Sequence, residues 1–102
     1  MLPRHAHELM LRLERIGDVG CTEIRKLELP YWYGQERTTK AIWRDIAERW
    51  SELLEVWGLK SSLLVGEAEG VWVFVWGEGL RTPDGSRSSW LKDVNDLAGY
   101  TD

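Results

Sequence analysis

Residues 38–57 have the sequence TTKAIWRDIAERWSELLEVW, which carries the strongest helical pattern of the chain. Apolar side chains recur there every three or four positions, the spacing that places them on one face of an α-helix. This apolar stripe consists of Ile42, Ile46, Trp50, Leu53 and Trp57. Thr38 or Thr39 is suited to begin the helix as its N-cap, and Gly58 is suited to end it. We therefore expect a long amphipathic helix around which the rest of the chain folds.

The segments before this helix predict two shorter helices. Residues 4–16 place leucine and isoleucine at helical spacing, and Gly17 is expected to end this first helix. A short second helix is expected to begin at Thr22, as its N-cap, and to end just before Pro30. The consecutive aromatic residues 31–33 then form a loop that leads to the long helix.

The segments after the long helix predict a β-hairpin. Residues 59–65 and 71–76 form its strands, and the glycine-bounded residues 66–70 form its turn. The second strand is apolar on both faces, which favours a partner for one of them. Ser88 or Ser89 is expected to begin a last short helix.

The length and composition predict one soluble α+β domain. The chain has 102 residues, of which 43% are hydrophobic and 29% are charged. We expect a single domain over residues 1–102, with the hairpin at about 59–76 and a loop and short helix over 77–102. The single cysteine, Cys21, excludes an internal disulfide and is expected to be a buried thiol. No apolar run approaches the ~20 residues of a membrane span, so a cytoplasmic protein without membrane contact is expected.

The formal net charge of −4 is distributed unevenly along the chain. Residues 1–50 hold nine Lys or Arg against eight Asp or Glu, whereas residues 51–102 hold four against nine. Any contact with the phosphates of a nucleic acid must therefore come from the first half. The acidic second half is better suited to a basic protein.

The predicted order of helix, short helix, long helix, hairpin and short helix is that of a winged helix-turn-helix domain. The segment Thr38–Ile46 resembles the recognition helix of DeoR-type and biotin-repressor-type winged helix-turn-helix regulators. Those helices share a pattern of residue types at fixed spacing. It consists of a capping Ser or Thr, a Thr or Ala, an aliphatic residue, an Arg-Asp pair and a second aliphatic residue. Their positions are held here by Thr38, Ala41, Ile42, Arg44, Asp45 and Ile46. In that family a short turn joins the second and third helices, whereas residues 29–37 here form a longer aromatic connection.

The resemblance implies that the chain binds duplex DNA as a homodimer and regulates transcription. The long helix would enter the major groove, its first residues would hold phosphates, and Lys40 and Arg44 would contact the bases. The hairpin would be the wing. The DNA-binding residues in this interpretation are Arg37, Thr38, Thr39, Lys40, Trp43 and Arg44.

An alternative interpretation is a small acidic inhibitor, of the anti-defence or immunity type, that binds a basic protein and not DNA. The acidic hairpin turn favours it, because a wing that contacts phosphate would carry Lys or Arg. Consecutive aromatic residues in a loop are also suited to anchoring a protein partner. The partner-binding residues would then be Tyr31, Trp32, Tyr33, Glu67, Glu69, Trp72, Phe74 and Trp76.

Residue patterns typical of catalysis or metal binding are not found in the sequence. His5 and His7 are two positions apart and would point to different sides of a helix, so they do not form a ligand pair. There is no glycine-rich phosphate loop and no nucleophile motif. We therefore expect a binding protein that is not an enzyme and needs neither metal nor cofactor.

Overall fold

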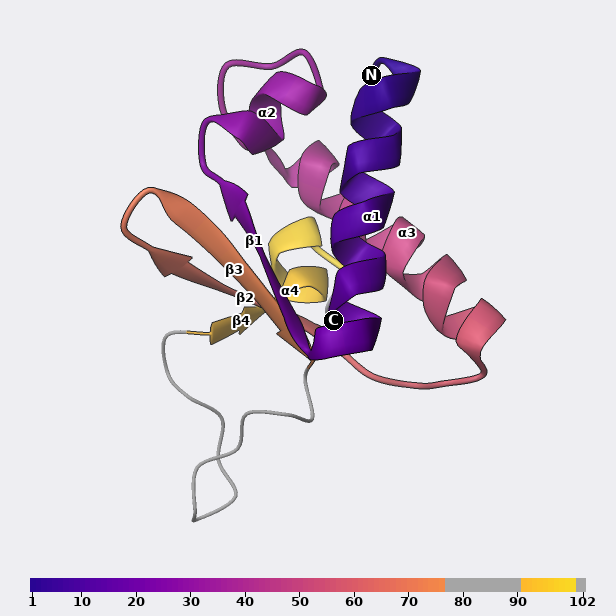
Figure 1. Ribbon diagram of the computed structural model, residues 1–102. Helices are drawn as coiled ribbons and strands as arrows, with labels where there is room; N and C mark the ends of the chain where they lie inside the picture. Colours follow the sequence, from indigo (N-terminus) through magenta and orange to yellow (C-terminus); the bar gives the residue numbers. More distant parts are fainter. Residues whose placement is uncertain (77–90, 101–102) are drawn as a thin grey trace.

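The computed structural model describes residues 1–76 and 91–100 of the chain (Figure 1). The helices are α1 (Pro3–Val19), α2 (Glu28–Trp32), α3 (Lys40–Trp57) and α4 (Val94–Ala98). The strands are β1 (Cys21–Arg25), β2 (Leu63–Ala68), β3 (Val71–Trp76) and β4 (Leu91–Asp93). The predicted α+β class is therefore confirmed.

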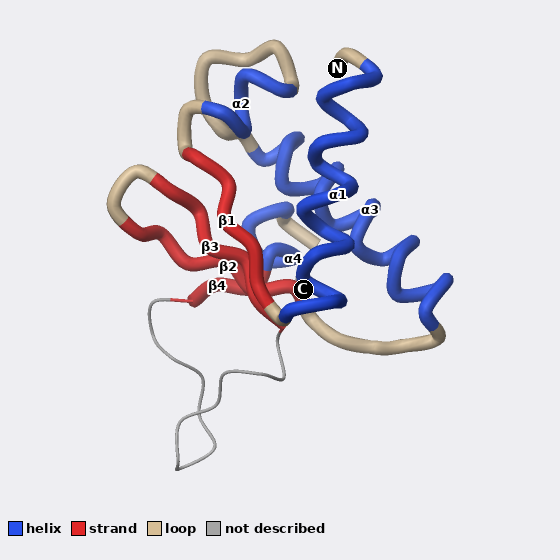
Figure 2. The backbone as a smooth tube through the Cα atoms, in the orientation of Figure 1, coloured by secondary structure: helices blue, strands red, loops and turns tan. Residues whose placement is uncertain are grey.

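The strands of the described part form one antiparallel sheet in the order β1-β3-β2-β4. Figure 2 shows the strands gathered on one side of the molecule and α1, α3 and α4 on the other. The main core lies between these two layers. It combines the apolar stripes of α1 and α3 with the sheet residues that face them, and its fully buried members include Leu9, Leu13, Ile24, Ile42, Ile46 and Phe74.

Strand β3 is apolar on both faces because it lies inside the sheet, between β1 and β2. Phe74 faces the helices and is fully buried in the main core. Val75 lies on the opposite face, where it packs with Leu64 and Leu91 in a second, smaller apolar cluster. Burial within the chain therefore accounts for both faces at these two residues.

The prediction of a helix beginning at Thr22 is wrong. Residues 21–25 form strand β1, in which exposed and buried residues alternate, with Thr22 and Ile24 facing inward. Both inward residues are β-branched, which favours a strand that packs against a core. The short helix begins later, as α2, and Pro30 lies inside it. Proline is tolerated there because the first turn of a helix leaves its N–H groups without intrahelical partners.

The two long helices begin and end close to the predicted residues. α3 ends at Trp57, and its C-cap Gly58 has a φ of 69°, the left-handed conformation that favours glycine. Its N-cap position is held by Thr39, the second of the two predicted threonines. α1 continues past Gly17, its predicted end, to Val19, and its C-cap Gly20 has a φ of 92°.

The C-terminal half differs from the prediction in detail. β2 begins at Leu63 and includes Gly66, so that the hairpin turn is only Glu69 and Gly70. The predicted start of the last helix at Ser88 or Ser89 lies outside the described residues. The chain instead enters the short strand β4 and then α4, whose N-cap Asp93 accepts a hydrogen bond from the main-chain N–H of Asn95 at 2.8 Å.

Candidate functional site

The residues predicted to hold phosphates, Arg37, Thr38 and Thr39, lie together where α3 begins, next to Lys40. Arg37 and Lys40 are exposed, and Thr38 and Thr39 are half-buried. The Thr39 hydroxyl donates a hydrogen bond to Oε1 of Gln35 at 3.0 Å and makes no cap bond to the main chain of α3. The Thr39 side chain therefore leaves uncapped the N–H groups that the start of α3 presents to an anion, although the N–H of Ile42 donates to the main-chain oxygen of Thr39.

Two residues predicted to contact bases lie beside the C-terminal end of α4. Nε of Arg44 donates a hydrogen bond to the main-chain oxygen of Ala98 at 2.8 Å, and its guanidinium lies 5.7 Å from the centre of the Tyr100 ring. The side chain of Lys40 runs past Gly99, where a β-carbon would lie 3.1 Å from Nζ. Both long side chains thus contact the chain's own C-terminal segment.

Trp43 lies in the core, with 7% of its surface exposed. Its ring meets the Trp72 ring edge-on at a centroid distance of 5.2 Å and lies 6.3 Å from the Phe74 ring. Such perpendicular aromatic pairs contribute about 0.5–1.5 kcal/mol beyond the burial of their surface. The structure therefore places Trp43 between α3 and the sheet, away from the basic residues with which it was grouped.

The solvent-facing side of α3 becomes acidic after its first turns. Glu48, Glu52 and Glu55 are exposed at helical spacing. Glu48 accepts a hydrogen bond from the Tyr100 hydroxyl at 3.1 Å. A duplex lying along this face would bring its phosphates near carboxylates.

The three consecutive aromatic residues point to different surroundings. Tyr31 is 62% exposed and its ring lies 5.2 Å from that of His5, whereas Trp32 is buried in the main core. Tyr33 is half-buried and its hydroxyl donates a hydrogen bond to Asp45, which also accepts one from Arg49 at 2.8 Å. Of the predicted partner-binding aromatic segment, only Tyr31 thus presents most of its surface to solvent.

The buried phenol of Tyr33 is electrostatically distinct from an exposed one. Burial, and then its hydrogen bond to the carboxylate of Asp45, raise the pKa of Tyr33 far above its usual value. The hydroxyl therefore stays protonated and donates its hydrogen bond to Asp45, which connects the end of α2 to α3. This contact positions α3 relative to α2.

Tyr31 borders an apolar hollow of about 350 Å³ between the start of α1 and α2. We call this surface the Tyr31 patch, and its members are Met1, Leu2, His5, Tyr31, Trp32 and Gly34. Met1 and Leu2 are about half exposed. Because apolar side chains surround an open hollow here, the surface is suited to contact with another apolar surface.

The predicted hairpin surface is divided by the fold. Glu67 is exposed and forms a 3.0 Å ion pair with Lys26, whose ammonium lies 5.3 Å from the centre of the Trp72 ring. Glu69 is exposed in the turn, while Trp72 is half-buried against the core. Trp76 belongs to β3, and its side chain lies outside the described residues.

A groove that the sequence analysis missed lies between α1 and β1. It has a volume of about 370 Å³ and is bordered by Arg12, Arg15, Val19, Cys21, Thr22 and Glu23. We call it the α1/β1 groove. Cys21 is exposed there, so the prediction of a buried thiol is wrong. The β-branched residues at alternate positions, Thr22 and Ile24, favour a strand over residues 21–25. This pattern was not used because a helix was predicted over the same residues.

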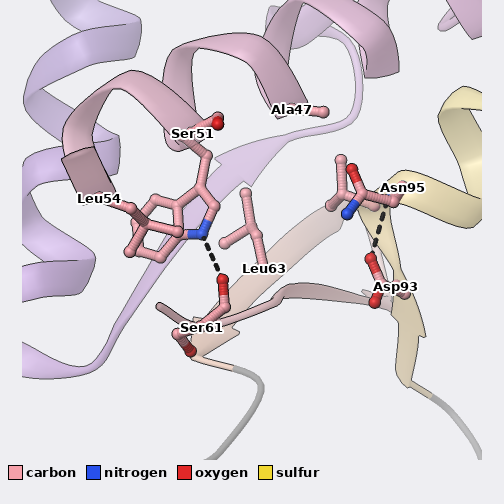
Figure 3. Close-up of a pocket in the computed structure, with 9 residues that line it drawn as sticks. Ala47, Ser51, Leu54, Ser61, Leu63, Asp93 and Asn95 are labelled. Atoms are coloured by element: carbon pink, nitrogen blue, oxygen red, sulfur yellow. Dashed lines mark hydrogen bonds between the residues drawn. The ribbon is translucent and has the colours of Figure 1, made fainter. Parts of the chain in front are cut away.

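A smaller cavity of about 120 Å³ lies between α3 and the strands, near the start of α4 (Figure 3). Two of its lining side chains make hydrogen bonds: Nε1 of Trp50 donates to the main-chain oxygen of Ser61 at 3.3 Å, and Asp93 caps α4. Pockets that enclose small-molecule ligands are typically about 300–1,000 Å³. This cavity therefore has room for a few water-sized molecules but not for a substrate.

Within residues 1–76 and 91–100, no group of three or more His, Cys, Asp and Glu side chains is placed to hold a metal ion. No helix in these same ranges combines the length and apolar character needed to cross a membrane. No protein-family model, curated protein or solved structure gives a match to this chain.

Proposed function

We propose that the chain is a small protein-binding domain whose partner docks on the Tyr31 patch. The observation that carries this proposal is that Tyr31 remains 62% exposed beside an apolar hollow, while Trp32, the next residue, is buried. Tyrosine is enriched among the residues that dominate binding energy in protein interfaces. Its ring provides apolar contact area and its hydroxyl a hydrogen bond.

The net charge of the chain, which comes from residues 51–102, favours a basic partner during long-range encounter and does not arise at the patch itself. The formal net charge is −4, and a domain of one sign attracts and orients partners of the other sign during encounter. The partner's apolar side chain would fill the hollow beside Tyr31.

The contacts of Arg44 and Lys40 argue against DNA binding through α3. Arg44 and Lys40 contact the C-terminal segment, and the face of α3 beyond them is acidic. A helix that contacts bases in the major groove needs a solvent-exposed face that is neutral or basic, with side chains that are not held by other parts of the protein. Here that use would require both side chains to leave Ala98 and Gly99.

Duplex DNA binding is a second candidate, because the connectivity supports a winged-helix type of fold. The elements follow the order α1-β1-α2-α3-β2-β3, and β1 joins the β2–β3 hairpin by pairing with β3. A hairpin directly after the third helix is the arrangement expected of a wing. Arg37, Thr38 and Thr39 would then hold phosphates at the start of α3.

The protein-binding proposal is tested with Tyr31→Ser and, as a matched control, Val56→Ser, which alters an apolar residue that is 80% exposed on α3. Proteins retained by the wild-type chain are identified, purified and titrated calorimetrically against all three chains. We expect Tyr31→Ser to weaken the binding of such a partner by at least about thirtyfold, the effect of a ~2 kcal/mol anchor, and Val56→Ser to leave it unchanged. Equal affinities for the three chains would overturn the proposal.

The DNA candidate is tested by fluorescence anisotropy with a labelled random-sequence duplex, titrated at increasing salt. Binding through several phosphates would weaken steeply with salt and would be lost in the double variant Arg37→Glu and Lys40→Glu. Lys60→Glu is the control, because Lys60 is exposed just after α3. No binding at low salt excludes this candidate and leaves the Tyr31 test unaffected.

A further inference from the structure

Strand β1 has an outer edge without a neighbouring strand among the described residues, because it ends the sheet order β1-β3-β2-β4. Nη1 of Arg12 donates a hydrogen bond to the main-chain oxygen of Glu23 at 2.7 Å, so this carbonyl points away from β3 and toward α1. In an antiparallel strand the N–H and C=O of one residue point to the same side, and every second residue repeats the direction. Cys21, Glu23 and Arg25 therefore direct their main-chain groups to the outer edge.

The α1/β1 groove runs along this edge. A helix on one side and a free strand edge on the other form the type of groove in which an extended peptide adds a strand to a sheet. The main chain of β1 would provide the hydrogen bonds, and the side chains of α1 would select the sequence. Its volume of about 370 Å³ is in the range of sites that bind ligands rather than single waters.

The charge around the groove is opposite to that of the whole chain. Among the residues that border it, Arg12 and Arg15 from α1 stand against one carboxylate, that of Glu23. The chain as a whole carries −4. This local excess of arginine favours carboxylates, which arginine can bind through two parallel hydrogen bonds.

We propose that an extended acidic segment of a partner protein binds in the α1/β1 groove by adding a strand to the edge of β1. A peptide N–H would replace Arg12 as the donor to the Glu23 carbonyl, and the freed guanidinium would bind a carboxylate of the peptide. Arg15 would bind a second carboxylate on the same side of the peptide. This site is separate from the Tyr31 patch and does not depend on the proposed function.

A second copy of the chain is a less suitable occupant of this edge. Two β1 strands pairing antiparallel around Glu23 would place the two Glu23 carboxylates opposite each other, which is destabilising. A nucleic acid would use the arginines but would leave the main-chain edge of β1 without partners. Both are outcomes that the experiment distinguishes.

The experiment uses the full chain and a fluorescein-labelled peptide in which glutamate and valine alternate over seven residues, with a lysine–valine peptide as control. Binding is followed by fluorescence anisotropy at low salt. We expect the acidic peptide to bind, the lysine peptide not to bind, and the double variant Arg12→Gln and Arg15→Gln to bind at least tenfold more weakly. Arg4→Gln is the matched control, an exposed arginine of the same helix, and is expected to bind like the wild type.

Strand addition is tested separately from charge attraction by amide hydrogen exchange. The amides of Glu23 and Arg25 should exchange at least tenfold more slowly with the acidic peptide bound, while the amide of Ile24, directed toward β3, should change little. Glu23→Pro removes the outward N–H and should abolish peptide binding. The variant is expected to fold, because proline is tolerated where an edge strand faces solvent. The exchange measurement keeps the test decisive even if that variant does not fold.

Three results would overturn the proposal: no binding of the acidic peptide, binding without slower exchange at Glu23 and Arg25, or equal binding of the lysine peptide. A wild-type dimer that becomes monomeric in Glu23→Pro would assign the edge to a second copy instead. Displacement of the acidic peptide by single-stranded DNA, without slower exchange at Glu23, would assign the arginines to phosphate.

Discussion

Gly17 lies so close to the indole of Trp57 that a β-carbon at residue 17 would be 2.7 Å from ring carbon Cη2. Gly17 lies within α1, and Trp57 is the last residue of α3. The absence of a side chain at residue 17 therefore lets the ends of the two long helices approach each other. The glycine is explained by packing and not by the helix end predicted from the sequence.

We predict that Gly17→Ala destabilises the protein by about 1 kcal/mol, measured by urea unfolding. Alanine favours a helix over glycine by about 1 kcal/mol, but overpacking costs about 1–3 kcal/mol. In a Trp57→Ala background the clash is gone, so the same substitution should become stabilising. An equal effect of Gly17→Ala in both backgrounds would show that the two residues are not coupled.

The hydrogen bond from Arg44 to Ala98 predicts that Arg44 stabilises the C-terminal segment. Arg44→Gln should lower the free energy of unfolding by about 1 kcal/mol, the usual net value of one hydrogen bond. The amides of Gly99 and Tyr100 should exchange faster in this variant. Arg37→Gln, which alters an exposed arginine, serves as the control. Unchanged exchange at both amides would contradict the stabilising role of Arg44.

The raised pKa of Tyr33 predicts a loss of stability at alkaline pH. An unfolded tyrosine releases its proton near pH 10, whereas folded Tyr33 keeps its proton at that pH. Above pH 10, ionisation therefore stabilises the unfolded chain relative to the folded one. The stabilisation is therefore complete below about pH 10 and is lost as the pH rises further. Urea unfolding at a series of pH values should show a smaller alkaline decrease for Tyr33→Phe than for the wild type. Parallel decreases would contradict the assignment.

The exposure of Cys21 predicts that its thiol reacts in the folded protein. A thiol reagent that absorbs on reaction, mixed with the native chain, should modify the single cysteine without denaturant. The acidic peptide proposed for the α1/β1 groove should slow this reaction, because Cys21 borders the groove. Modification only after unfolding would contradict the exposed position.

The sequence predicted the elements whose pattern is local and long. The apolar stripe of α3 spans five helical turns, so the sequence predicted both ends of this helix to within two residues. β1 was missed because it has five residues, and its β-branched alternation becomes decisive only when β3 lies beside it. β4 has three residues and depends in the same way on its pairing with β2.

The candidate surfaces were predicted less well than the helices, because exposure depends on what packs against each side chain. Tyr31, Trp32 and Tyr33 are equivalent in the sequence, yet one is exposed, one is buried and one binds Asp45. Arg44 is on the polar face of α3 as expected, but α4 ends beside it. The α1/β1 groove can be predicted only when β1 is known to be a strand. The positions of Arg12 and Arg15 in the sequence therefore did not indicate a binding site.

The register of β1 also determines when the chain can fold. Cys21 pairs with Val75, so an edge of the sheet joins segments more than fifty positions apart in the order of synthesis. Closing such a loop costs entropy before any strand contact is gained, which slows folding relative to helical bundles of the same size. While the ribosome makes the first half, β1 has no strand to pair with. The sheet therefore assembles only after β3 has emerged.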